Sequence, residues 1–158
     1  MSDKFMPMTV IIDKLDKIGV AKVVEQLVGL GISEEAAQKV ITLISSNTLE
    51  ELESAFEESE IGKEGIKELK TFHKYFDLLE CFNSVVFDPS LARGLSYYTG
   101  CIFEVKSLET EMGSIGGGGR YADLTSNFGL KNMPGVGVSF GAERIYDVME
   151  ELNKFPEN

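Results

Sequence analysis

The sequence has no tryptophan, a single histidine and only two cysteines in 158 residues. Cys81 and Cys101 do not show the paired spacing of a zinc site, so we expect free thiols rather than a metal centre or a disulfide. His73 lies in an amphipathic stretch, which favours a packing or surface role. These residue types therefore give no support to a zinc site or to a catalytic histidine.

Long hydrophobic runs are also missing. No apolar run approaches the roughly 18 to 20 residues that cross a bilayer, and the start MSDKFMPM lacks a basic-then-apolar signal pattern. A hydrophobic content of 43% indicates a globular chain, long enough for one domain or for two small ones. We expect a cytoplasmic protein without membrane contact.

Positive charge is scarce, since 15 basic residues face 26 acidic ones and the net charge is −11. The acidic excess is −7 (9 against 16) up to residue 82 and −4 (6 against 10) after it, so it is not confined to a tail. Without a basic face, this piece is not expected to make a broad contact with nucleic acid by itself.

Arginine is the scarcest cation, with three residues against twelve lysines. Arg93, Arg120 and Arg144 each lie in a separate glycine-bearing patch, at 92–100, 113–124 and 135–145. Guanidinium binds planar anions with two prongs, and glycine lets a ligand lie against the backbone. The pattern predicts that three guanidinium groups gather around one small carboxylate or phosphate compound.

The glycines alone leave two structures open. Eleven of the sixteen lie between Gly94 and Gly141, and the run 116–119 fits either a backbone against which a ligand lies or only a structural element. That element would be a mobile turn or a strand with small side chains. The tyrosines at 97, 98 and 121 favour a pocket.

Residues 10–82 show the three- and four-residue apolar spacing of helices. Ser33 is expected to cap one helix, Thr48 with Glu51 forms a capping box for the next, and a longer helix is expected from about Lys63. Their apolar stripes predict a packed core. This half resembles a helical accessory module.

After residue 82 the pattern changes to short β-branched runs separated by proline and glycine. We expect strands at 85–87, 101–105 and 136–140, a lead-in at 113–115, a short helix near 121–128 and a helix at 142–153. The predicted class is α+β, with a helical domain at 1–82 and a mostly antiparallel sheet with one packed helix at 83–158.

Three motifs, in this order, resemble the histidyl-tRNA synthetase family of class II aminoacyl-tRNA synthetases. RGLSYYTG at 93–100 is similar to its first histidine signature, GGGRY at 117–121 to its second, and GVGVSFGAER at 135–144 to class II motif 3. The helices before them are similar to the insertion domain of that family. The resemblance implies part of a class II catalytic fold.

The resemblance implies an ATP-dependent ligase that joins L-histidine to the histidine tRNA through histidyl-adenylate, with Mg²⁺ accompanying ATP. It also implies a homodimeric full-length enzyme. We find no motif 1, motif 2 or anticodon-binding domain, so we expect an internal fragment that is inactive alone.

Matching positions imply roles for individual residues. Arg93 would be the catalytic residue and would contact the histidine carboxylate and α-phosphate, while Tyr97, Tyr98 and Tyr121 would line the histidine pocket. Arg144 would contact ATP along its adenine and γ-phosphate. The glycines that would allow the nucleotide to approach are Gly118, Gly119 and Gly141. Glu104 is a candidate Mg²⁺ ligand.

Two flanking positions depart from the family pattern, since Ser96 and Ala122 stand where aspartate is usual. They put only secondary contacts in doubt.

Two other functions remain open. A histidine-sensing regulatory paralogue of ATP phosphoribosyltransferase shares this fold, but such paralogues are expected to lose part of the arginine set. The spacing of Gly135, Gly137 and Gly141 also resembles a dinucleotide fingerprint. However, Pro134 stands where a strand should end, and Asp147 and Glu150 come too early for the ribose-binding acid.

Overall fold

The computed structural model describes residues 4–46, 48–80, 83–94 and 98–156, and it divides into compact units at 1–92 and 93–158. The sequence pattern places its boundary ten residues earlier, near residue 82. The segment 83–92 thus groups with the helical unit by contacts, and the predicted domain boundary stays a prediction. Each unit is described separately below.

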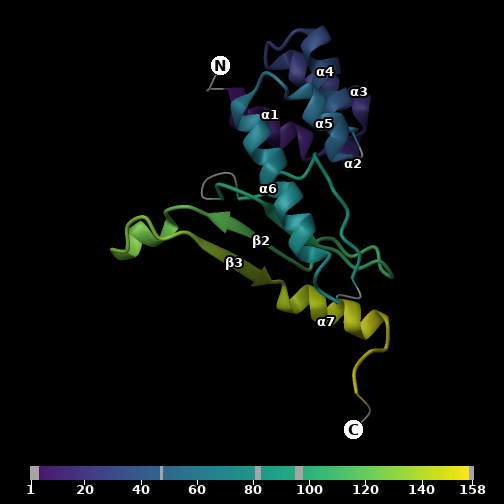
Figure 1. The fold of residues 1–158 in the computed structure, drawn as a ribbon. Coiled ribbons are helices and arrows are strands. Elements are labelled where there is room, and N and C mark those ends of the chain that lie inside the picture. The colour runs from purple at the N-terminus through teal and green to yellow at the C-terminus, as the bar shows by residue number, and fades with distance from the viewer. Residues whose placement is uncertain (1–3, 47, 81–82, 95–97, 157–158) are drawn as a thin grey trace. The chain divides into compact units, whose positions relative to one another are not determined.

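In the part of the first unit that the structure describes, the regular elements are helices (Figure 1). They are α1 (Phe5–Ile12), α2 (Leu15–Ile18), α3 (Val20–Gly29), α4 (Glu34–Ile44), α5 (Leu49–Ala55) and α6 (Glu60–Phe76).

Side-chain caps fix where these helices begin. The hydroxyl oxygens of Ser33 and Thr48 accept hydrogen bonds from the amides of Ala36 and Glu51, each at 3.3 Å, which confirms both expected caps. Helix α6 begins at Glu60, three residues before the predicted start, because the Ser59 hydroxyl accepts from the Gly62 amide at 3.1 Å.

The core of this unit lies around α3. Val23 and Leu27 are fully buried against Ala37 of α4, and α1 and α2 also pack on α3. A separate contact joins α5 to α6, and each of these helices carries one buried hydrophobic side chain, Leu52 and Ile66. The predicted core is therefore confirmed for one side of α3. Its other side stays open to solvent.

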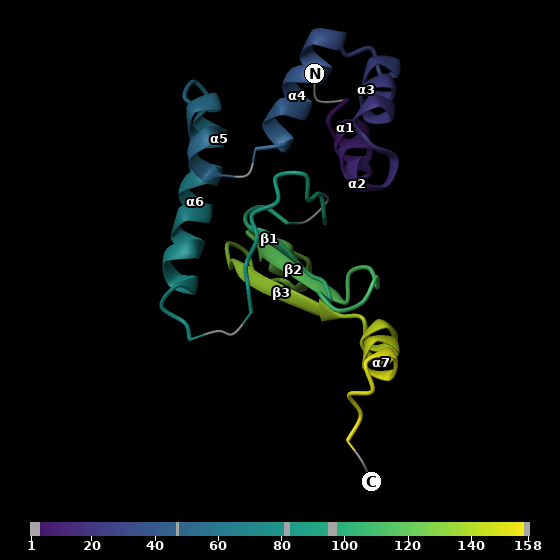
Figure 2. The ribbon, with the colours of Figure 1, turned by 90° about the vertical axis from the view of Figure 1, so that its right-hand side faces the viewer.

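The second unit is built on three strands, β1 (Ile102–Val105), β2 (Gly116–Tyr121) and β3 (Gly135–Phe140). They form an antiparallel sheet in the order β1-β2-β3, with Ile102 opposite Gly119 and Phe140 opposite Gly116 (Figure 2). Helix α7 (Ala142–Glu151) follows β3 directly, and a short 3₁₀ helix, η2 (Leu124–Phe128), connects β2 to β3. The predicted α+β class is confirmed.

Two details of the predicted sheet are corrected. Residues 85–87 form no strand, because no described strand lies beside them to complete the hydrogen bonds, and an Asp88–Ser90 turn follows. The glycine run is itself the central strand, so of the two structural forms the strand is confirmed and the mobile turn is wrong.

Among the described residues, no helix combines the length and apolar character that crossing a bilayer requires.

Candidate functional site

The glycine strand β2 presents two different faces. Successive residues of a strand point to opposite faces, and directly paired residues of antiparallel strands share a face. Gly117 and Gly119 therefore lie on one face together with Glu104, which is paired with Gly117. We call this the arginine face, because the Arg93 guanidinium lies against it.

Side chains lie directly on the backbone of the arginine face. A Cβ atom on Gly117 would overlap Arg93 Nη1, and a Cβ atom on Gly119 would lie 2.9 Å from the Tyr98 ring. Glycine is required at both positions because any larger residue would displace these two side chains. The glycines thus serve as a floor for Arg93 and Tyr98.

The Tyr121 ring extends this arrangement to β3. Tyr121 is the last residue of β2 and alternates onto the same face as Gly117 and Gly119. Its ring would lie 2.6 Å from a Cβ atom on Gly135 and 3.4 Å from one on Gly137. Each of the three described side chains from the predicted pocket, Arg93, Tyr98 and Tyr121, therefore lies over glycine.

Arg93 is held in place through its Nη1 atom. This atom lies 3.2 Å from Glu104 Oε1 and donates to the Ser114 hydroxyl at 3.0 Å and to the Gly116 carbonyl at 3.3 Å. Glu104 is mostly buried, with 17% of its side chain exposed, and its Oε2 lies 3.3 Å from Lys106 Nζ. The hydrogen bonds and the ion pair of Arg93 found among the described residues are made by Nη1, which leaves Nε and Nη2 as candidate donors to a ligand.

Arg144 reaches the same point from a different element. It lies in the first turn of α7, and its Nη1 donates to the Ser114 carbonyl at 2.7 Å. The structure thus brings Arg93 and Arg144 together at Ser114, although the two arginines are far apart in the sequence.

The third arginine does not join them. Arg120 stands between Gly119 and Tyr121 in β2 and is paired with Val136 of β3. Strand alternation directs its side chain to the opposite face. The expectation that all three guanidinium groups converge is therefore wrong for Arg120.

The remaining predicted residues fall in different places. Gly118 faces away from Arg93, where a Cβ atom would overlap the Gly137 carbonyl oxygen and lie 2.7 Å from the Phe103 ring. Close strand packing is thus sufficient to explain why this residue is glycine. Gly141 immediately precedes α7, and its amide donates to the Ile115 carbonyl at 2.8 Å. Tyr97 lies outside the described residues.

The described residues do not fit a Mg²⁺ ion held by this chain. They contain no group of three or more His, Cys, Asp and Glu side chains that could hold a metal ion. Each oxygen of the candidate ligand Glu104 faces a cation, Arg93 or Lys106, that a metal would have to displace. We therefore assign Glu104 to the orientation of Arg93 instead.

No sequence pattern singles out Ser114. It lies inside the quoted patch 113–124, but one serine before a glycine run forms no recognisable pattern. Its importance depends on two arginines from other parts of the chain, which only the tertiary structure brings to it.

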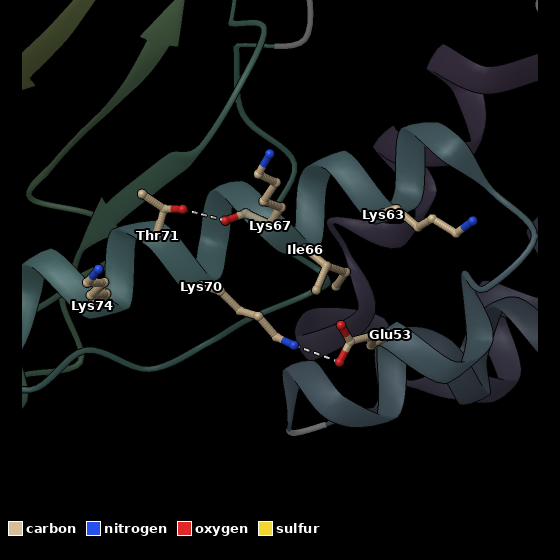
Figure 3. A pocket seen from close by; sticks show the side chains of 7 residues that line it. All are labelled: Glu53, Lys63, Ile66, Lys67, Lys70, Thr71 and Lys74. Carbon is tan, nitrogen blue, oxygen red and sulfur yellow. Dashed lines mark hydrogen bonds and ion pairs between the residues drawn. The ribbon is translucent and has the colours of Figure 1, made fainter.

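The helical unit has a shallow cavity of about 340 Å³ between α5 and α6 (Figure 3). Its lining residues are Glu53, Lys63, Ile66, Lys67, Lys70, Thr71 and Lys74. Lys70 Nζ lies 2.6 Å from Glu53 Oε2 across the cavity, and Lys63 pairs with Glu60 at 2.9 Å. These ion pairs are typical of a solvated helix face, so we do not take this cavity as the site.

The architecture has a solved counterpart. The structure is similar to the crystal structure of histidyl-tRNA synthetase from Nostoc sp. PCC 7120, with a TM-score of 0.87 and 33% sequence identity. The match covers 99% of this chain and 38% of that one. The fold is thus that of part of an aminoacyl-tRNA synthetase.

The family model described as histidyl-tRNA synthetase matches residues 9–145, so the chain belongs to that family. It is 49% identical to a histidine–tRNA ligase of Porphyromonas gingivalis, over 98% of this chain and 35% of the relative. It is 50% identical to one of Flavobacterium johnsoniae, over 99% of this chain and 34% of the relative. The chain therefore spans about a third of the length of these curated relatives.

The dinucleotide-binding interpretation is not supported. Gly135 and Gly137 lie within β3, which pairs antiparallel with β2. A dinucleotide fingerprint instead occupies the turn between a parallel strand and its helix.

Proposed function

We propose that the whole protein is a histidine–tRNA ligase and that residues 93–144 supply part of its catalytic site. The observation that carries this proposal is the fixing of Arg93 and Arg144 at one residue, Ser114, beside the glycine floor of β2. Family membership and the names of the relatives support the same activity.

In the proposed first step, a carboxylate oxygen of histidine attacks the α-phosphorus of ATP and pyrophosphate leaves. In the second step, a hydroxyl of the terminal ribose of the tRNA attacks the acyl carbon and AMP leaves. Negative charge builds up on the α-phosphate in the first step, and a fixed guanidinium stabilises it without reorganising in the transition state. Arg93 is held in this way by Glu104 and Ser114.

The proposed residue roles follow the same geometry. Arg93 contacts the histidine carboxylate and the α-phosphate through its Nε and Nη2 donors, because Nη1 is already engaged. Tyr98 and Tyr121 line the histidine pocket on the arginine face, and Tyr97 is proposed to do so from its neighbouring position in the sequence.

Arg144 is proposed to bind ATP, with Gly141 allowing the nucleotide to approach. The same role for Gly118 and Gly119 has less support, because Gly118 faces the opposite side of the sheet and the Tyr98 ring lies over Gly119. Mg²⁺ is expected to arrive with the ATP phosphates. The full-length enzyme is proposed to be a cytoplasmic homodimer.

The test is histidine-dependent ATP–pyrophosphate exchange by the full-length protein, followed by charging of histidine tRNA. We expect both activities in the full-length protein and neither in the 158-residue chain. Histidine binding without exchange would instead support the histidine-sensing regulatory paralogue. Exchange with a different amino acid would contradict the proposal.

A further inference from the structure

We propose that Ser114 is a positioning residue that holds Arg93 and Arg144 at a fixed separation. This inference rests on the proposed function, because it assigns the two arginines to one substrate pair. Ser114 itself has no proposed contact with histidine or with ATP.

The Ser114 hydroxyl both accepts and donates a hydrogen bond. Its oxygen accepts from Arg93 Nη1 at 3.0 Å, and its O–H donates to the Gly116 carbonyl at 2.9 Å. A hydroxyl has a single hydrogen to donate, so the bond to Gly116 fixes its lone pairs relative to the β2 backbone. Arg93 is therefore oriented by the strand through Ser114.

The Ser114 carbonyl performs the same task for Arg144. It accepts from Arg144 Nη1 at 2.7 Å, a short bond typical of a charged donor. The hydrogen bond from the Ser114 hydroxyl to the Gly116 carbonyl spans residues 114–116 and fixes the backbone there. The Ser114 carbonyl that accepts from Arg144 is therefore held in place by the same bond. Loss of the hydroxyl should loosen both arginines, although the Arg144 bond is to the Ser114 backbone and Arg93 keeps its contacts with Glu104 and Gly116.

Glu104 holds Arg93 independently of Arg144. Its carboxylate pairs with Arg93 at 3.2 Å and with Lys106 at 3.3 Å. Glu104 orients the guanidinium of Arg93 alone, whereas Ser114 holds the guanidinium groups of both Arg93 and Arg144. Coupling matters because the proposed ligands of Arg93 and Arg144 belong to one ATP molecule, and misplacement by about 1 Å can cost roughly a hundredfold in rate.

The experiment compares Ser114→Ala, Ser114→Thr and a control, Ser107→Ala, in the full-length protein. Ser107 belongs to the same unit, and its hydroxyl accepts from the Glu109 amide at 3.3 Å, a bond separate from those that hold the two arginines. We expect kcat/KM for exchange to fall about ten- to a hundredfold in Ser114→Ala, the size of one lost hydrogen bond to a charged group. Ser114→Thr keeps the hydroxyl and should restore most of the activity, and the control should match the wild type.

A double variant separates positioning from simple folding. If Ser114 acts through Arg93, combining Ser114→Ala with Arg93→Lys should reduce exchange by less than the product of the two single losses. The KM for ATP should also rise in Ser114→Ala, because the Ser114 carbonyl that positions Arg144 is then less well fixed. Thermal unfolding of each variant shows whether it is folded.

Three results would overturn the inference. They are wild-type kinetics in Ser114→Ala, a loss that multiplies fully with Arg93→Lys, and a loss that Ser114→Thr does not restore although the variant is folded. If the wild-type protein binds histidine but performs no exchange, the proposed function fails separately. Ser114 is then judged by histidine affinity, and unchanged affinity in Ser114→Ala overturns the inference.

Discussion

The two units of this chain hold their side chains by different means. All eight buried hydrophobic side chains found among the described residues belong to the helical unit, and Val23 and Leu27 are fully buried there. In the sheet unit the buried run is Gly116 to Gly119, whereas Val136, Val138 and Phe140 of β3 are 66%, 52% and 74% exposed. The helical unit is thus organised by apolar packing and the sheet unit by polar contacts to backbone.

This difference separates stability from chemistry. A packed apolar core is sensitive to changes in side-chain volume, but it does not require charged groups at particular positions. The arginine face has the opposite requirement, because Arg93, Glu104 and Ser114 must keep their contacts within hydrogen-bond distance. Substitutions in the helical core should therefore change unfolding, and substitutions on the arginine face should change activity.

The largest effect is expected for Arg93→Ala in the full-length protein. Loss of a fixed positive charge at the α-phosphate should reduce ATP–pyrophosphate exchange by about a thousandfold, or about 4 kcal/mol. Circular dichroism should check that the variant is folded, because Arg93 also pairs with the mostly buried Glu104. Arg93→Lys is the matched control and should recover part of the rate, since it keeps the charge but loses the fork. Near-normal exchange in Arg93→Ala would exclude Arg93 as the catalytic residue.

Leu27→Ala should be the most damaging change in the helical unit. Truncating this fully buried side chain should cost about 3 kcal/mol of unfolding free energy. Chemical denaturation of the 158-residue chain measures it, with far-UV circular dichroism for the helices.

The matched control for Leu27→Ala is Val138→Ala on the exposed face of β3, which should change the unfolding free energy by less than about 0.5 kcal/mol. Four of the five tyrosines follow residue 92, so near-UV circular dichroism reports mainly on the sheet unit. Equal costs for the two substitutions would contradict the contrast between the units.

Gly118→Ala should destabilise the sheet unit without touching the arginine face. Its new Cβ atom would overlap the Gly137 carbonyl oxygen, which is backbone and cannot rotate away. Forcing the strands apart should cost about 2 kcal/mol, visible in the tyrosine signal during denaturation. An unchanged midpoint would show that β2 and β3 do not pack this closely.

Gly65→Ala should have the smallest effect, and of opposite sign. Gly65 lies inside α6, and a Cβ atom there meets nothing within 4 Å. The substitution should stabilise the helix by about 1 kcal/mol, because alanine loses less backbone entropy in a helix than glycine. A destabilised Gly65→Ala chain would reveal a contact on α6 that the structure does not describe.

Local signals in the sequence predicted much of the helical unit. The caps at Ser33 and Thr48 are confirmed because a cap needs only residues three positions away. The start of α6 was misplaced because the Ser59 cap has glycine at its third position and lacks the usual acidic partner. Residues 85–87 were wrongly predicted as a strand, since β propensity does not reveal whether a neighbouring strand is present.

The candidate site was only partly predictable, because its contacts are non-local. The scarcity of arginine directed attention to Arg93 and Arg144, and the structure brings both to Ser114. The sequence does not show that the glycine run is a strand, so it cannot show on which face of the sheet each residue lies. Arg120 was therefore wrongly grouped with Arg93 and Arg144. Glu104 was noticed, but its pairing with Arg93 was not foreseen.

The central position of the glycine strand has a further consequence for folding. Four consecutive residues without side chains present the same surface after any slip along their neighbours, so Gly116–Gly119 cannot select their own partners in β1 and β3. The pairing register of β2 must therefore be set by the side chains that lie on its glycines, above all Arg93, Tyr98 and Tyr121. Correct alignment of the sheet and assembly of the catalytic groups should therefore occur in one cooperative step, and misaligned molecules should be inactive rather than partly active.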